Sequence, residues 1–184
     1  VNPKTRMRSS ARVGVGGRVA ASQKFPPMIS TQVSHHINAP RDAVYQALLD
    51  ATSVATWMVP DGMTSEVHVF DPCEGGVFRI SLTYDPPTLI GKTSLQTDTF
   101  HGLFVKLMPD EQVVQLVEFE TFDPEMFGEM RITLTLTDSE SGGTELHAVH
   151  DNLPPGLSPW DNEAGWRTSL AKLASLVERA VQHA

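Results

Sequence analysis

The last stretch of the chain, residues 158–184, has the pattern of one long amphipathic helix, and this feature constrains the fold most. Ser158 is a suitable N-cap, Pro159 fits the first helical position, and Asp161 stands where a capping-box acid is found. Apolar residues recur at helical spacing along one stripe: Trp166, Leu170, Leu173, Ala174, Val177 and Val181. Such a stripe must be buried, so the rest of the chain has to provide a surface for it.

The residues ahead of this helix alternate between apolar and polar side chains, which is typical of strands with one buried face. Strands are expected at 64–70, 77–84, 94–107, 112–122, 129–137 and 144–150. Turn sequences and an expected loop over 85–92 separate them, so that sequential strands are antiparallel neighbours. Gly102, inside the longest strand, is a candidate for a β-bulge.

The N-terminal part of the patterned region adds one strand and two short helices. Residues 30–37 predict a strand with Val33 and Ile37 on one face. Asn38-Ala39-Pro40 is a helix-start signal, the helix extends to about Leu49, and a second short helix is expected over 52–58. The order of elements predicts an α+β fold, in which the C-terminal helix covers the apolar face of one antiparallel sheet.

Charge is unevenly distributed along the chain. Residues 1–28 contain six basic side chains and no acidic one, and they show no sustained periodicity. We predict that they form a disordered or non-native tail ahead of one domain over residues 29–184. The remainder carries 8 basic and 22 acidic residues, a net charge of −14. Such a surface is a poor match for nucleic acid or for an anionic membrane, so neither is expected as a partner.

Simple counts and short motifs disfavour other classes of protein. The single cysteine, Cys73, cannot form an internal disulfide, which predicts a reducing, cytoplasmic location. Its acidic neighbours Asp71 and Glu74 should raise the thiol pKa and make it a poor nucleophile. No apolar run has the length of a membrane span. Gly75-Gly76 belongs to a turn, and without a Walker or GxGxxG motif we expect no cofactor.

Seven histidines raise the question of a metal site. Glu66 and His68 share one strand face, as do Glu145 and His147. No third ligand is found at a recognisable spacing, so we predict no metal. The pair His150-Asp151 could act as a base and its orienting acid, although adjacent residues of a strand point to opposite faces.

Three arginines are the basic groups that could hold an anionic or carbonyl group of a ligand: Arg79, Arg131 and Arg167. Because adjacent strand residues point to opposite faces of a sheet, Arg79 lies on the face opposite Phe78, and Arg131 on the face opposite Met130. We therefore expect the first two arginines to face outward.

Two groups of motifs carry a family resemblance. The opening group is Asn38-Ala39-Pro40 with Val44 and Leu48, then Trp57, Asp71, Gly75-Gly76 and Phe78-Arg79. The closing group is Gly143-Thr144-Glu145-Leu146, Leu153-Pro154, Gly165-Trp166 and Leu170-Ala171-Lys172-Leu173. Together they resemble the proteins named after the activator of Hsp90 ATPase (AHSA1-like), a family of the START/Bet v 1-like (SRPBCC) superfamily. The resemblance covers roughly residues 30–180.

The resemblance implies a helix-grip fold, in which a strongly bent antiparallel sheet wraps the C-terminal helix and leaves an apolar cavity between them. Nine residues are expected to line that cavity: Trp57, Phe78, Ile80, Phe100, Phe119, Ile132, Trp166, Leu170 and Leu173. For each residue alone, ordinary core packing is the commoner role of a large apolar side chain. As a set they suit a small apolar ligand.

Three functions follow from the resemblance as hypotheses. The leading one is binding of a small hydrophobic or amphipathic molecule under the C-terminal helix. The second is an enzyme of the polyketide cyclase or aromatase kind, which needs a titratable group in the cavity wall. The third is a cofactor of an Hsp90-type chaperone or another protein-interaction role, which rests on the family name alone. An exposed strand at a sheet edge can also pair with a second copy, so a homodimer is one expectation.

Overall fold

The computed structural model describes residues 29–85, 93 and 96–183 of the chain. The tail expected over residues 1–28 lies outside the described residues, as does nearly all of the loop expected over 85–92. The elements follow the expected order, with one short 3-10 helix added. They are β1 (Thr31–Ile37), α1 (Arg41–Leu49), α2 (Ala51–Trp57), β2 (Met63–Phe70), β3 (Val77–Tyr84), β4 (Thr97–Met108), β5 (Gln112–Phe119), η1 (Pro124–Met126), β6 (Met130–Asp138), β7 (Thr144–Asp151) and α3 (Pro159–Gln182).

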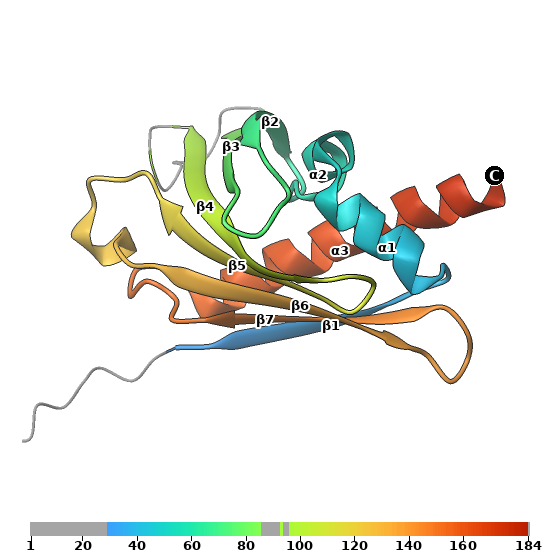
Figure 1. Cartoon of the computed structure of the whole chain (residues 1–184). Coiled ribbons are helices and arrows are strands. Elements are labelled where there is room, and N and C mark those ends of the chain that lie inside the picture. The colour runs from blue at the N-terminus through green and yellow to red at the C-terminus, as the bar shows by residue number, and fades with distance from the viewer. Residues whose placement is uncertain (1–28, 86–92, 94–95, 184) are drawn as a thin grey trace, which may run out of the picture.

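The seven strands form one antiparallel sheet in the order β1-β7-β6-β5-β4-β3-β2. The sheet curls around α3, which crosses its concave face, while α1 and α2 lie beside the helix (Figure 1). This arrangement confirms the α+β helix-grip fold. Strands β1 and β2 form the two edges of the sheet.

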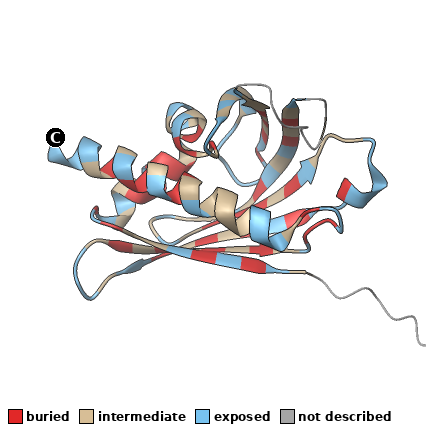
Figure 2. Cartoon of the chain, turned by 180° about the vertical axis from the view of Figure 1, so that it is seen from behind, coloured by how far each residue is buried: buried red, intermediate tan, exposed pale blue. Residues whose placement is uncertain are grey.

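The buried side of α3 is the stripe that its sequence spacing predicts. Ser158 caps the helix, and its Oγ accepts a hydrogen bond from the backbone N–H of Asp161 at 3.3 Å. The buried residues are Ser169, Leu170, Leu173, Ala174 and Val177. Val181 is exposed, so its assignment to the buried stripe was wrong. The last turn of the helix lies beyond the surface that the sheet and α1 provide, and residues 179–183 are all exposed (Figure 2).

The connection between β5 and β6 is longer than the alternation predicts. β5 ends at Phe119 rather than at residue 122, and η1 follows after Asp123. The carboxylate of Asp123 accepts a hydrogen bond from the backbone N–H of Glu125 at 3.0 Å, which caps this short helix. An Asp-Pro pair favours a helical turn over further strand pairing, because proline supplies no N–H for a sheet ladder.

Gly102 is not a bulge. It stays in register opposite Phe78 and Val117, and the register irregularity of β4 lies between Phe104 and Lys106. A Cβ atom at Gly102 would overlap the carbonyl oxygen of Leu116 and would lie 2.6 Å from Cζ of Phe78. Glycine is therefore needed here for close approach, because the Phe78 ring packs directly over the backbone of β4.

We predict that Gly102→Ala lowers the free energy of unfolding by about 1–3 kcal/mol, because the added methyl group overpacks the sheet. Gly165→Ala is the matched control, since the nearest atom to its Cβ would be Cγ of Pro60 at 3.8 Å. In the interior of α3 this change should stabilise the protein by about 0.5–1 kcal/mol. Urea unfolding of both variants measures the difference, and equal effects would contradict the close-approach role of Gly102.

Candidate functional site

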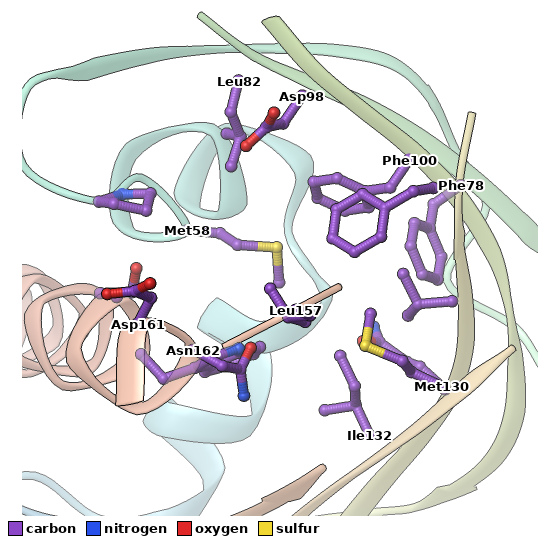
Figure 3. A pocket seen from close by; sticks show the side chains of 17 residues that line it. Met58, Phe78, Leu82, Asp98, Phe100, Met130, Ile132, Leu157, Asp161 and Asn162 are labelled. Atoms are coloured by element: carbon purple, nitrogen blue, oxygen red, sulfur yellow. The ribbon is translucent and has the colours of Figure 1, made fainter. Parts of the chain in front are cut away.

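A cavity of about 150 Å³ lies between the concave face of the sheet and the N-terminal half of α3. Its wall contains the side chains of β3 to β6, the segment after α2, and one face of the helix (Figure 3). Phe78 and Phe100 lie together on the sheet side, across from Met58 and Leu157. The cavity is thus lined mainly by aromatic rings, aliphatic side chains and methionines.

Five of the nine residues expected at the cavity are in its wall: Phe78, Phe100, Phe119, Ile132 and Trp166. Four of these five lie on strands, where alternation predicts which side chains face inward. Trp166 comes from α3, and its ring centroid lies 6.3 Å from that of Trp57.

The other four expected residues, Trp57, Ile80, Leu170 and Leu173, are buried but do not line the cavity. The indole N–H of Trp57 donates to the carbonyl oxygen of Ala47 at 3.0 Å, which holds the ring between the helices. Leu170 and Leu173 lie further along α3 than the cavity-lining residues and are completely buried. The sequence pattern predicts which face of a helix or strand is buried. It does not predict which residues of that face pack tightly and which line a cavity.

Several polar side chains in the wall were not expected. They are Asp98 on β4, Gln115 on β5, and Asp161, Asn162 and Ser169 on α3. The strand residues could have been found, because Asp98 lies two positions before Phe100 and Gln115 two before Val117, which places each pair on one face. Asp98 lies beside Leu82, at the end of the cavity away from Met130 and Ile132 (Figure 3).

The charged groups of the wall are acidic. Asp98 and Asp161 belong to it, whereas it contains no lysine, arginine or histidine among the residues that the structure describes. Arg79 forms two 2.8 Å hydrogen bonds with the carboxylate of Glu120, which hold the pKa of that carboxyl below its usual range. Arg167 pairs with Glu163 on α3 at 2.9 Å.

Behind the cavity lies a buried polar group, the imidazole of His150. Its ring centroid is 4.4 Å from that of Trp166, and the residue is 1% exposed. The amide of Asn162 donates to Thr31 Oγ1 at 2.8 Å, and Thr31 Oγ1 lies 3.2 Å from His150 Nδ1. Thr31 Oγ1 and His150 Nδ1 therefore share a hydrogen bond, whose direction depends on which ring nitrogen carries the proton.

His150 does not act with Asp151, as the alternation indicated. Asp151 points to the other face and accepts a hydrogen bond from Ser30 at 2.7 Å. Burial lowers the pKa of His150 to about 4, so the ring is neutral near pH 7. Its Nε2 has no hydrogen-bond partner among the described residues. Protonation of the ring is costly because the charged imidazolium would lose its hydration in this buried position.

Residues 38–178 match the family model described as activator of Hsp90 ATPase homolog 1-like protein. The chain belongs to this AHSA1-like family. A comparison with curated proteins found no match.

Solved structures share the fold of this AHSA1-like chain. Protein CV1439 from Chromobacterium violaceum is 29% identical, with a TM-score of 0.72 over 81% of this chain and 96% of that one. The AHSA1 protein from Silicibacter pomeroyi is 18% identical, with a TM-score of 0.67 over 84% and 100% of the two chains. The AHSA1-like protein from Aeromonas hydrophila is 19% identical, with a TM-score of 0.61 over 83% and 94%.

The remaining candidate groups of this AHSA1-like protein lie away from the cavity. Cys73 is exposed, and a hydrogen bond to Asp71 raises the pKa of its thiol, as its acidic neighbours indicated. Within the described ranges, no cluster of three or more His, Cys, Asp or Glu side chains could hold a metal ion. Among the helices that the structure describes, none is both long and apolar enough to span a bilayer.

We predict that acid destabilises the protein through His150. Its folded pKa lies below the unfolded value of 6.5, so the unfolded chain binds the proton first as the pH falls. Stability should be complete above about pH 6.5 and decrease toward pH 4, by at most about 3 kcal/mol from this group.

Urea unfolding of His150→Leu between pH 7 and pH 4 tests this prediction. The variant should lose most of the decrease that the parent shows in this range. His183→Leu, at the exposed end of α3, is the matched control and should keep it. An unchanged pH dependence in His150→Leu would contradict the assignment.

Proposed function

We propose that this AHSA1-like protein binds a small apolar or amphipathic molecule in the cavity under α3. The observation that carries the proposal is the space itself, which a mainly apolar wall leaves unfilled. Interiors rarely keep voids larger than a water molecule, because each lost contact reduces stability. A ligand would restore those contacts.

The size of the space sets the size of the molecule. The cavity measures about 150 Å³. An engineered apolar cavity of about 150 Å³ in another protein stays dry and binds benzene. The part of the proposed ligand that this space holds is therefore a single ring or a group of similar volume. The rings of Phe78, Phe100 and Trp166 suit an aromatic guest, since offset and edge contacts between rings add to area burial.

Toluene, titrated in a calorimeter, is a suitable first probe. We predict binding to the parent protein and a loss of affinity of about tenfold or more, or 1.4 kcal/mol, in Val117→Phe, whose ring fills the space. Toluene at a hundred times its Kd should also stabilise the parent protein by about 2.7 kcal/mol.

Val77→Phe is the control, because Val77 is exposed on the opposite face of β3 and should leave binding unchanged. Val117→Leu serves as a milder filling variant if the phenylalanine disturbs folding. Absence of toluene binding to the folded parent protein would refute the proposal.

One observation supports a second candidate function, an enzyme of the cyclase or aromatase kind. The carboxyl group of Asp98 lies in the cavity wall, and the residue is almost completely buried. A carboxyl group next to a bound molecule can transfer protons as a general acid or base. Mass spectrometry of molecules extracted from the parent protein and from Asp98→Asn separates the two functions. An enzyme predicts chemically different molecules, and a binding protein predicts the same one.

The family name supports a third candidate, an interaction with an Hsp90-type chaperone. Phe122 and Phe127, in the connection between β5 and β6, are 99% and 54% exposed, as a docking surface requires. An ATPase assay with an Hsp90-type chaperone tests this role. Stimulation that is lost in Phe122→Ser would support it, and no stimulation by the parent protein would exclude it.

A further inference from the structure

We propose that the cavity selects uncharged ring compounds that carry a hydrogen-bonding group, and that Gln115 is the residue that recognises this group. The inference rests on the proposed binding function and extends it from a general apolar ligand to one chemical class. Two independent features of the wall lead to it: an amide side chain at a buried, inward-facing position and the absence of a basic side chain among the described lining residues.

Gln115 is an unusual residue for its position. In the ladder of the sheet it lies between Phe104 of β4 and Ile132 of β6, on the concave face. The residue is 4% exposed and lines the cavity. The buried side-chain atoms without a partner in the described ranges are Ser65 Oγ and His150 Nε2, and the Gln115 amide is not one of them. A polar side chain at an inward-facing position of a cavity wall is poorly explained by packing alone.

The amide of Gln115 can both donate and accept a hydrogen bond. A hydroxyl, amine or amide group on a ligand could therefore satisfy it, whatever the orientation of that group. A hydrocarbon ligand would offer the amide no hydrogen bond. The ligand that fits best has an apolar ring against Phe78 and Phe100 and one small polar substituent at Gln115.

The electrostatics of the wall limit the charge of this substituent. The acidic groups are Asp98 and Asp161, and no lysine, arginine or histidine from the described part of the chain joins them. A ligand carboxylate or phosphate would lose its hydration without finding a cation to pair with. The described wall therefore disfavours anionic ligands such as fatty acids and aromatic acids, while a neutral group meets no such penalty.

Two pairs of ligands with matched shapes test the inference on the folded, full-length protein. Phenol and toluene differ in a hydroxyl against a methyl group, and benzamide and benzoate differ mainly in charge. Gln115→Leu should weaken phenol about 2- to 12-fold, the range expected for one hydrogen bond, and should leave toluene unchanged or slightly tighter. The parent protein should bind benzamide at least about tenfold more tightly than benzoate.

Gln32→Leu, the same change at an exposed position of β1, is the control and should leave all four affinities unchanged. Gln115→Met keeps the length of the side chain and replaces Gln115→Leu if that variant does not fold. The inference is overturned if the Gln115 variants weaken toluene and phenol equally, if they weaken neither, or if benzoate binds as tightly as benzamide. If the parent protein binds toluene but one of these results is found, only this inference is refuted. If the parent protein does not bind toluene, the proposed function is refuted as well.

Discussion

The burial of α3 against the concave face of the sheet is the interaction on which the rest of the structure depends. Neither partner is stable alone, because the helix has an apolar stripe and the sheet has one apolar face. The curl of the sheet makes the contact uneven along the helix. Leu170 and Leu173 are completely buried, and α1 and α2 also contact the helix. Toward the N-terminus of α3 the sheet, the segment after α2 and Leu157 surround the cavity.

The difference between the two halves of α3 explains how one fold can combine a stable core with a binding site. In the packed half, removal of a side chain would create a void and reduce stability. In the half that lines the cavity, Gly165 and Ser169 are small, and Trp166 provides one large wall. The neutral His150 behind Trp166 joins β1, β7 and α3 through Thr31 and Asn162. The polar network thus supports the cavity wall from behind.

Much of the fold could be predicted from the sequence, because alternation and helical spacing report which face of each element is buried. Ile132 and Phe100 face inward and are buried, as alternation predicts. The extent of packing along a face could not be predicted, since it depends on elements distant in sequence. Trp57 and Leu170 show this: both are fully buried, but other elements cover them.

The polar wall was missed for a different reason. Gln115 and Asp98 occupy inward positions of their strands, and a polar residue there interrupts an apolar pattern without changing the prediction of a strand. Such interruptions mark candidate functional positions, because a core selected for stability alone would have an apolar residue at each inward position. Gly102 is a further case. Glycine is unfavourable inside a strand, which the sequence shows, but the reason for it, the close approach of the Phe78 ring, is visible only in the structure.

The pairing of β1 with β7 has a consequence for the order of events during synthesis. Thr31 lies opposite His150, so the first strand of the sheet has no strand partner until β7 has left the ribosome. Strands β2 to β6 can pair with their neighbours as they appear, but contacts between residues so far apart in sequence close late and slow folding. The cavity is later still, because α3 completes its wall. A ligand could therefore bind only after β1 has paired with β7 and α3 has packed against the sheet, so it would stabilise completely folded chains and no earlier state.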